Sequence, residues 1–340
     1  MKFFDKILEE PSYCWSEKDG SLITPTVKQL FCETFRRINI FKSRKNWASL
    51  INWLITICMM PFFILFVLKY FSITRFILFV LYSMIAMGTH ATIWLHRYCT
   101  HKAFAFSHPV WRIIIQNLVI KTCPEEIYVV SHHVHHAKPD MPGDPYNSKC
   151  GLMYCMLAGV NHQPISKNLT RQEYNKVVKF LKHTGIRVNS YQAYNKWGSA
   201  TSIVYVFALW LLNWAVWYSI LYFIGGHGLS CTLFSAAMFW FVLVPAFNYT
   251  GHGNGNSRHV DGIDFDRRSL AINQVRPGLL CGEWHNNHHL YPGSARCDFL
   301  NSQIDISWIL IYTMFKLRIV SSYRDNKKDF KRKYMQEQAN

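Results

Sequence analysis

Four stretches of this chain are long and apolar enough to cross a lipid bilayer as helices, which takes about 20 residues each. They occupy residues 47–68, 76–95, 202–224 and 229–247. A short loop joins the first two stretches and another joins the last two, so each pair predicts a helical hairpin. We therefore expect an all-α integral membrane protein with four transmembrane helices in two hairpins.

The basic residues lie almost entirely outside these stretches. Residues 1–46 carry nine Lys and Arg, residues 96–199 carry thirteen and residues 248–340 carry thirteen, whereas the two hairpin loops contain only Lys69 and Arg75. Because loops rich in Lys and Arg stay on the cytoplasmic side, we expect both termini and the long central loop to be cytoplasmic. The formal net charge of +17 then reflects topology and contact with anionic lipid headgroups, and we expect no nucleic-acid binding.

A fifth apolar run, residues 110–120, is too short to span. It places Arg112, Gln116 and Lys121 on one helical face and apolar residues such as Ile114 on the other. This pattern predicts an amphipathic helix that lies in the membrane interface.

The composition agrees with a membrane protein. Half of the residues are hydrophobic, 16% are aromatic and only 17% are charged, against about 25% charged residues in soluble domains. The ten cysteines form no C-x-x-C pair, so we expect reduced thiols and no disulfide framework.

Histidines supply the chemical signal. The chain has sixteen, and most of them are grouped just beyond the ends of the apolar stretches. In chain order the groups are His96 and His101; His132, His133, His135 and His136; His252; and His285, His288 and His289.

The spacing within these groups predicts convergence. Positions i, i+3 and i+4 of a helix fall within about 100° of arc, and the last group has this spacing. In the second group, His132, His135 and His136 have this spacing, but His132, His133 and His136 would also fit within a similar arc. The last group has no histidine at its i+1 position, and this similarity between the two groups favours His135 over His133. His96 and His101 are five apart, about 140° around a helix, and would converge best if His101 lies at or just past a helix end.

So many imidazoles would repel one another when protonated and would be costly to bury without partners. A metal removes both problems, because neutral imidazole binds iron, zinc, copper and nickel. Nine histidines exceed the needs of one ion, so we predict two metal ions with four or five nitrogens each and with positions left for oxygen or water. A closed structural zinc site would use four ligands, often with cysteine, which this pattern does not provide.

A membrane metal transporter or metal sensor is a remote alternative. Transporters place ionisable ligands near the bilayer midplane, whereas these histidines follow the ends of the spans, with His90 as the exception.

The histidine clusters, in this order around two hairpins, resemble the membrane fatty acid desaturases, with the acyl-CoA Δ9 desaturases most similar in architecture. The likeness extends over about residues 50–320. The matching motifs are His96 to His101, Asp144-Pro145-Tyr146-Asn147, Asn248 to His252, and Gly282-Glu283-Trp284-His285-Asn286-Asn287-His288-His289 with Tyr291-Pro292.

This resemblance implies four membrane helices beneath a cytoplasmic helical cap that holds two iron ions. It also implies that Asn248 binds through a water and that Asp144 and Glu283 orient imidazoles. The iron ligands that it implies are His96, His101, His132, His135, His136, His252, His285, His288 and His289.

The implied reaction uses O2 and two electrons to remove two hydrogens from an acyl chain, and a lipid-chain hydroxylase or acetylenase is the alternative on the same scaffold. The segment before His132 lacks the arginine that holds coenzyme A in the animal relatives, so acyl-CoA, acyl-carrier-protein and lipid-bound substrates all remain open. We expect a separate electron donor of ferredoxin or cytochrome b5 type. The expected organisation is an N-terminal segment (1–46), a desaturase domain (47–320) and a basic tail (321–340).

Overall fold

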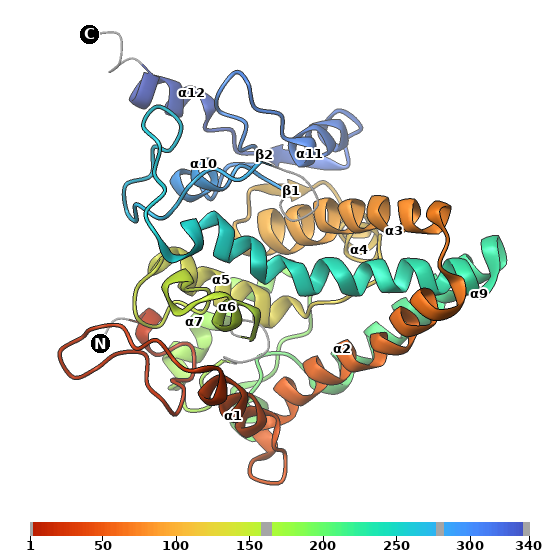
Figure 1. Ribbon diagram of the computed structural model, residues 1–340, viewed down its shortest axis with the longest axis horizontal. Helices are drawn as coiled ribbons and strands as arrows, with labels where there is room; N and C mark the ends of the chain where they lie inside the picture. The colour runs from red at the N-terminus through yellow and green to blue at the C-terminus, as the bar shows by residue number, and fades with distance from the viewer. Residues whose placement is uncertain (1–2, 158–164, 277–281, 336–340) are drawn as a thin grey trace.

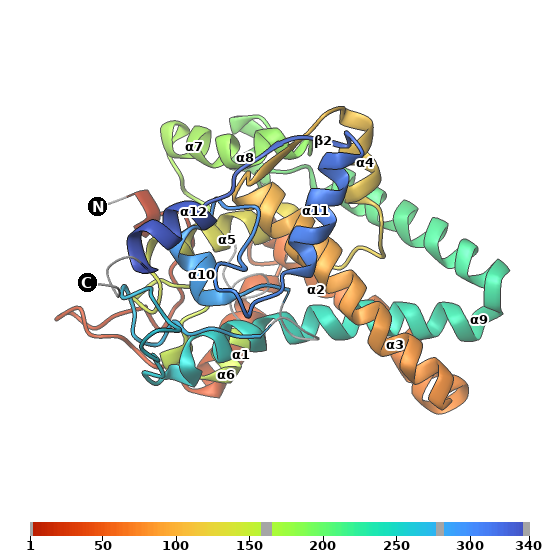
Figure 2. The same ribbon diagram turned by 90° about the horizontal axis from the view of Figure 1, so that it is seen from above.

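The computed structural model describes residues 3–157, 165–276 and 282–335. The chain is mostly helical, and long helices extend from a body of shorter helices and loops (Figures 1 and 2). The helices are α1 (Val27–Ile38), α2 (Trp47–Leu65), α3 (Ile73–Ala86), α4 (Pro109–Gln116), α5 (Glu125–Ala137), α6 (Leu152–Leu157), α7 (Arg171–Leu181), α8 (Tyr191–Trp197), α9 (Ile203–Gly251), α10 (His285–Leu290), α11 (Ile306–Lys316) and α12 (Lys327–Phe330). Short 3-10 turns are η1 (Phe3–Asp5), η2 (Arg44–Asn46), η5 (Ser148–Cys150), η6 (Lys182–Thr184) and η7 (Gly253–Gly255), and π-helical segments are η3 (Phe66–Tyr70), η4 (Met87–Thr100) and η8 (Lys331–Met335).

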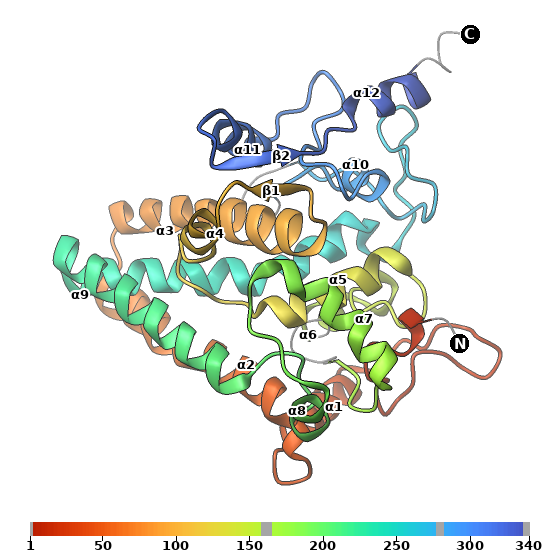
Figure 3. The same cartoon turned by 180° about the vertical axis from the view of Figure 1, so that it is seen from behind.

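Three continuous helical segments among the described residues are long and apolar enough to cross a membrane: Arg44–Tyr70, Ile73–Thr100 and Ile203–Gly251. The third covers both of the last two predicted stretches. Its geometry breaks at Gly225 and Gly226, where Gly226 adopts a φ of 67° that glycine accepts without steric cost. Two arms of α9 meet at this bend, at the left edge of Figure 3. The sequence predicted four separate spans, and the structure shows three candidate helices with the third one bent.

Aromatic side chains pack α2 and α3 against α9. The ring centroids of Phe62 and Phe234 lie 4.7 Å apart, and those of Phe79 and Phe239 lie 5.0 Å apart. Other large apolar side chains point outward, such as Phe223, which is 85% exposed. A soluble protein rarely exposes long apolar faces of this kind, so these helices suit a lipid environment.

The prediction of an all-α chain was wrong in one detail. Strand β1 (Phe104–Phe106) pairs in antiparallel fashion with β2 (Val320–Tyr323) to form a small two-stranded sheet. Phe104 of β1 and Val320 of β2 are buried, whereas Ala105, Ser321 and Ser322 are exposed. These segments are too short to predict a strand from the sequence, and their pairing joins positions more than 200 residues apart.

The predicted interfacial helix is shorter than expected. Helix α4 ends at Gln116 and exposes the apolar residues Val110, Ile113 and Ile114. The following residues, 119–123, are buried and not helical, and Lys121 is 2% exposed instead of lying on a solvated face.

Side chains of α9 satisfy the backbone of this buried segment. Asn213 Oδ1 accepts the Lys121 N–H at 3.0 Å, and Trp214 Nε1 donates to the Lys121 carbonyl at 2.9 Å. The Lys121 ammonium lies 3.3 Å from Glu125 Oε1. Non-helical backbone that is buried away from water is stable only where protein groups replace water as its hydrogen-bond partners.

Candidate metal centre

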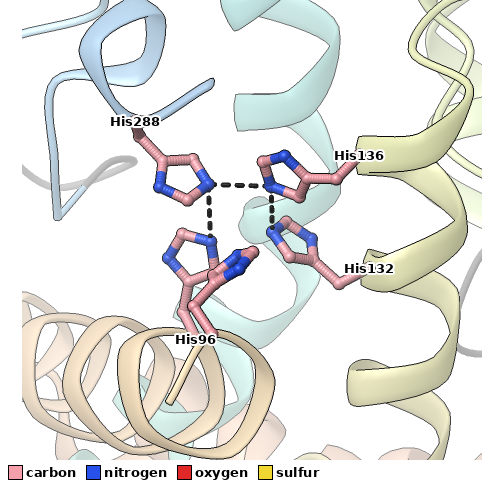
Figure 4. Close-up of side chains that lie close together, drawn as sticks. His96, His132, His136 and His288 are labelled. Carbon is pink, nitrogen blue, oxygen red and sulfur yellow. Dashed lines mark hydrogen bonds between the residues drawn. The ribbon is translucent and has the colours of Figure 1, made fainter. Parts of the chain in front are cut away.

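The structure brings all nine predicted histidines together in two groups. Within each group, one ring nitrogen from every histidine lies within 4.8 Å of the others. Group 1 consists of His96, His101, His132, His136 and His288, four of which are labelled in Figure 4. Group 2 consists of His135, His252, His285 and His289. Over the described residues neither His133 nor His90 belongs to a group, and the His133 ring instead stacks on Phe180 with centroids 4.2 Å apart.

Two helices each contribute to both groups. Helix α5 supplies His132 and His136 to group 1 and His135 to group 2, and α10 supplies His288 to group 1 and His285 and His289 to group 2. The i, i+3, i+4 spacing places the three rings of each helix on one face. Each helix therefore contributes to both groups from that single face. Both segments are helical, as the spacing predicted.

His96 and His101 meet through a change in helix type. Segment η4 continues the second span beyond its predicted end, and His101 is the residue at its C-cap. The His101 N–H donates to the His96 carbonyl at 3.1 Å, which is the i to i+5 bond of a π-helix. This bond places the two rings one turn apart, with centroids separated by 4.8 Å.

Carboxylates fix three of the rings. Glu283 Oε1 lies 2.6 Å from His96 Nδ1, Asp144 Oδ1 lies 2.9 Å from His135 Nδ1, and Asp140 Oδ2 lies 2.8 Å from His252 Nδ1. An ionised carboxylate can only accept, so each Nδ1 carries the hydrogen and each Nε2 presents a lone pair. This pairing is typical of histidines that bind metals.

The ring nitrogens that face the two group centres contact one another in group 1 and have no partner among the described residues in group 2. In group 1, His288 Nε2 lies 3.0 Å from His96 Nε2 and 2.8 Å from His136 Nε2, as the dashed lines in Figure 4 show. In group 2, Nε2 of His135 and His252 and both ring nitrogens of His285 and His289 are buried without a hydrogen-bond partner in the described structure. A cation at each centre would satisfy the clustered nitrogens of group 1 and the orphaned nitrogens of group 2, so these residues fit a metal ion in each group.

The electrostatics favour the neutral form of six of the nine rings. Burial, followed by the neighbouring histidines, holds the pKa well below its usual range for His101, His132, His136, His285, His288 and His289. Neutral imidazoles with free lone pairs are the form that binds a metal.

The sequence alone gives no signal that distinguishes Asp140 from an ordinary solvated acid. Asp140 is 112 residues from His252, and it also accepts hydrogen bonds from the hydroxyls of Ser148 and Ser269. Burial alone would raise the pKa of Asp140, but the contact with His252 and the hydrogen bond from Ser269 hold it well below its usual range. Asp140 therefore remains charged beside its histidine.

Glu283 is held in a similar way. Arg97 lies 3.4 Å from Glu283 Oε2 and donates to Asp305 Oδ2 at 2.7 Å. Cys297 approaches the same carboxylate at 3.7 Å, but burial raises the pKa of its thiol well above the usual range, so it stays a weak ligand.

Gly251, just before His252, gives the His285 ring its space. A Cβ at this position would lie 2.7 Å from His285 Cδ2. We expect Gly251→Ala to displace this ring, to lower the metal content and to reduce activity about 100-fold, since a shift of about 1 Å has that effect. Metal analysis of the purified protein together with product quantification tests this.

The matched control is Gly88→Ala, where a Cβ would meet only Ser307 Oγ at 3.9 Å. Equal losses in the two variants would show that helix perturbation, and not the His285 ring, causes the effect.

A narrow, mainly apolar cavity adjoins both groups. Leu95, Trp240, Phe241, Val244 and Phe247 line it together with His96, His132, His285 and His288. Asn248 and Glu283 also line this cavity, so Asn248 is placed where a bound water could connect it to a metal.

The comparisons with known proteins agree with this geometry. The family model described as "Fatty acid desaturase" matches residues 72–299, well over half of the chain. The chain is 26% identical over 255 residues to a hex-5-enoyl-[acyl-carrier protein] acetylenase of Moorena producens (strain JHB), covering 70% of this chain and 72% of that protein. It is 25% identical over 268 residues to an icosanoyl-CoA 5-desaturase of Limnanthes douglasii, covering 75% and 67% of the two chains. An sn-1 stearoyl-lipid 9-desaturase of Anabaena variabilis is 24% identical over 247 residues, covering 70% and 79%.

The family predicted from the histidine clusters is thereby confirmed. The matched residues contain all nine histidines of groups 1 and 2. They also contain Asp140, Asp144 and Glu283, the carboxylates that contact these rings. The chain belongs to the fatty acid desaturase family.

Proposed function

We propose that this protein is a fatty acyl desaturase that inserts a double bond into an acyl chain, with O2 and two electrons, at two histidine-bound irons. The observation that carries the proposal is the contact between the apolar cavity and the two groups of five and four histidines. An acyl chain in this cavity would lie against Trp240, Phe241 and Val244, with a methylene group facing the metals.

The reaction explains why the site contains metals and not only acids and bases. A methylene group has no acidic proton and no leaving group, so iron with an open coordination position would supply the oxidising chemistry. The chain gives up two hydrogen atoms, and these, with two electrons and two protons, reduce O2 to two molecules of water. The nine histidines would hold the irons, Asn248 would hold a water, and the buried aromatic walls would exclude bulk solvent.

The same proposal places the protein in the membrane with four spans, the two arms of α9 counting as two of them. Both termini and the histidine groups would then lie on the cytoplasmic side, where Lys and Arg are concentrated.

The acyl carrier is coenzyme A, acyl-carrier protein or a membrane lipid, and the relatives' names include all three. The electron donor would be a separate protein of ferredoxin or cytochrome b5 type.

An acetylenase is the second candidate, because one relative carries that activity in its name. It would remove two further hydrogens from an existing double bond. A hydroxylase would differ only in inserting oxygen at the same carbon.

Expression in a host that supplies both donor types, followed by mass spectrometry with double-bond localisation, tests the proposal. We expect new acyl chains that are lighter by two hydrogens, and about two irons per chain in the purified protein. A triple bond would favour the acetylenase, whereas only hydroxylated chains, or a single zinc, would contradict desaturation.

A further inference from the structure

A second hollow, which we name the cationic cleft, reaches group 1 from outside. Its volume is about 980 Å³, and it is bounded by β1, β2, the first turn of α4 and the end of α7. Lys102, Arg112 and Arg324 line it, and so does His101 of group 1. The cleft therefore connects solvent with one of the predicted metal ligands.

Among the described residues, none lines both the cleft and the apolar cavity. On α5, His132 faces the cavity, whereas the next residue, His133, faces the cleft. Successive residues of a helix point about 100° apart, so the two hollows approach group 1 from different directions. A substrate chain in the cavity would leave the cleft free.

The positive charges of the cleft are not neutralised within the described structure. No Asp or Glu lines the cleft, and none forms an ion pair with Lys102, Arg112 or Arg324 among the described residues. Arg324 instead donates to the carbonyls of His101 and Lys102. Burial, together with Lys102 and Arg112, lowers the pKa of His183 to about 4, although a hydrogen bond to the Tyr98 carbonyl opposes this shift.

The surface around the cleft continues this pattern. The segments 97–121, 174–199 and 306–324 that surround it contain no acidic residue. Their exposed cations beyond the cleft are Lys176, Lys179, Lys182, Arg187, Lys196, Lys316 and Arg318. A positive field spread over three segments suits an extended acidic surface better than one phosphate group.

We propose that the cationic cleft is the docking site of the separate electron donor, a small protein with an acidic surface around its redox group. The donor's redox group would lie nearest to His101, so electrons would enter at group 1 while the acyl chain occupies the cavity. The inference rests on the proposed function, since only an enzyme that consumes electrons needs a donor. The donor is oxidised and the enzyme is reduced, one electron at a time, until two have been transferred.

Charge reversal at one cation inside the cleft and one on the surface beside it tests the proposal. The variant is Lys102→Glu with Lys182→Glu, and the control is Lys18→Glu with Lys28→Glu, which changes the net charge equally at exposed positions on other segments. The probes are a reduced [2Fe–2S] ferredoxin and, separately, the reduced soluble haem domain of cytochrome b5. Their oxidation by the iron-loaded protein is followed spectroscopically in a stopped-flow instrument.

We expect the unaltered protein to oxidise at least one probe at a rate that falls steeply with salt, because screening weakens steering. The cleft variant should react about tenfold more slowly at low salt and should approach the unaltered rate at about 0.5 M salt. The control should stay within about twofold of the unaltered protein.

Equal rates in the cleft variant and the unaltered protein would overturn the proposal, as would a failure of the unaltered protein to oxidise either probe. A small uncharged reductant separates docking from catalysis, since product formation with it should be unaffected in the cleft variant. An increased requirement for acyl substrate with unchanged probe oxidation would assign the cleft to an anionic acyl carrier instead. If probe oxidation depends on the cleft but no unsaturated product forms, desaturation is contradicted and docking still stands.

Discussion

Replacing His288 with Ala is expected to abolish product formation and to lower the iron content from about two to about one per chain. Its Nε2 lies 3.0 Å from His96 Nε2 and 2.8 Å from His136 Nε2, so it is the ring that joins the contributions of η4 and α5. Removal of a group that merely orients a ligand costs about 10–100-fold in metal affinity or activity, and loss of a ligand should cost more. Metal analysis and acyl-chain mass spectrometry on the same preparation measure both effects.

The control is His133→Ala. His133 lies in the same cluster on α5, but it stacks on Phe180 and belongs to neither group. We expect this variant to retain both irons and most of its activity. Loss of iron in the His133 variant, or full activity in the His288 variant, would contradict the division of the histidines into the two groups.

The part of the site that follows from local spacing could be predicted from the sequence. The i, i+3, i+4 spacing identifies the metal-facing sides of α5 and α10. The comparison of the two spacings also excluded His133 from the predicted ligands. The five-residue separation of His96 and His101 favoured a helix end at or just before His101, and the structure has one there.

Contacts between distant segments were outside the reach of the sequence. Asp140 contacts His252 from the turn after α5, where the backbone of Asp140 has a φ of 57°. Likewise, the sequence predicted a helix through residue 120, but residues 119–123 form a buried loop. Asn213 and Trp214 of α9 supply hydrogen bonds to the backbone of this loop at Lys121. Each outcome depends on partners about 90 or more residues away, which no local pattern encodes.

Replacing Asp140 with Asn is expected to weaken the metal site of group 2 about 10–100-fold while leaving group 1 loaded. Asn accepts the left-handed backbone at this position, so the turn should survive. The amide lacks the negative charge that now makes His252 a stronger electron-pair donor. Iron retained during titration with a chelator, followed by Mössbauer spectroscopy, reports the loss of one site.

Glu283→Gln is the matched comparison, because Glu283 holds His96 of group 1 in the same way that Asp140 holds His252 of group 2. We expect the two variants to lose different irons, with the Glu283 variant weakened in group 1. If both variants lost the same iron, or both irons together, the two groups would act as a single cooperative site. The exposed Asp261, which is paired with Arg267, offers an Asp→Asn change that should leave both irons in place.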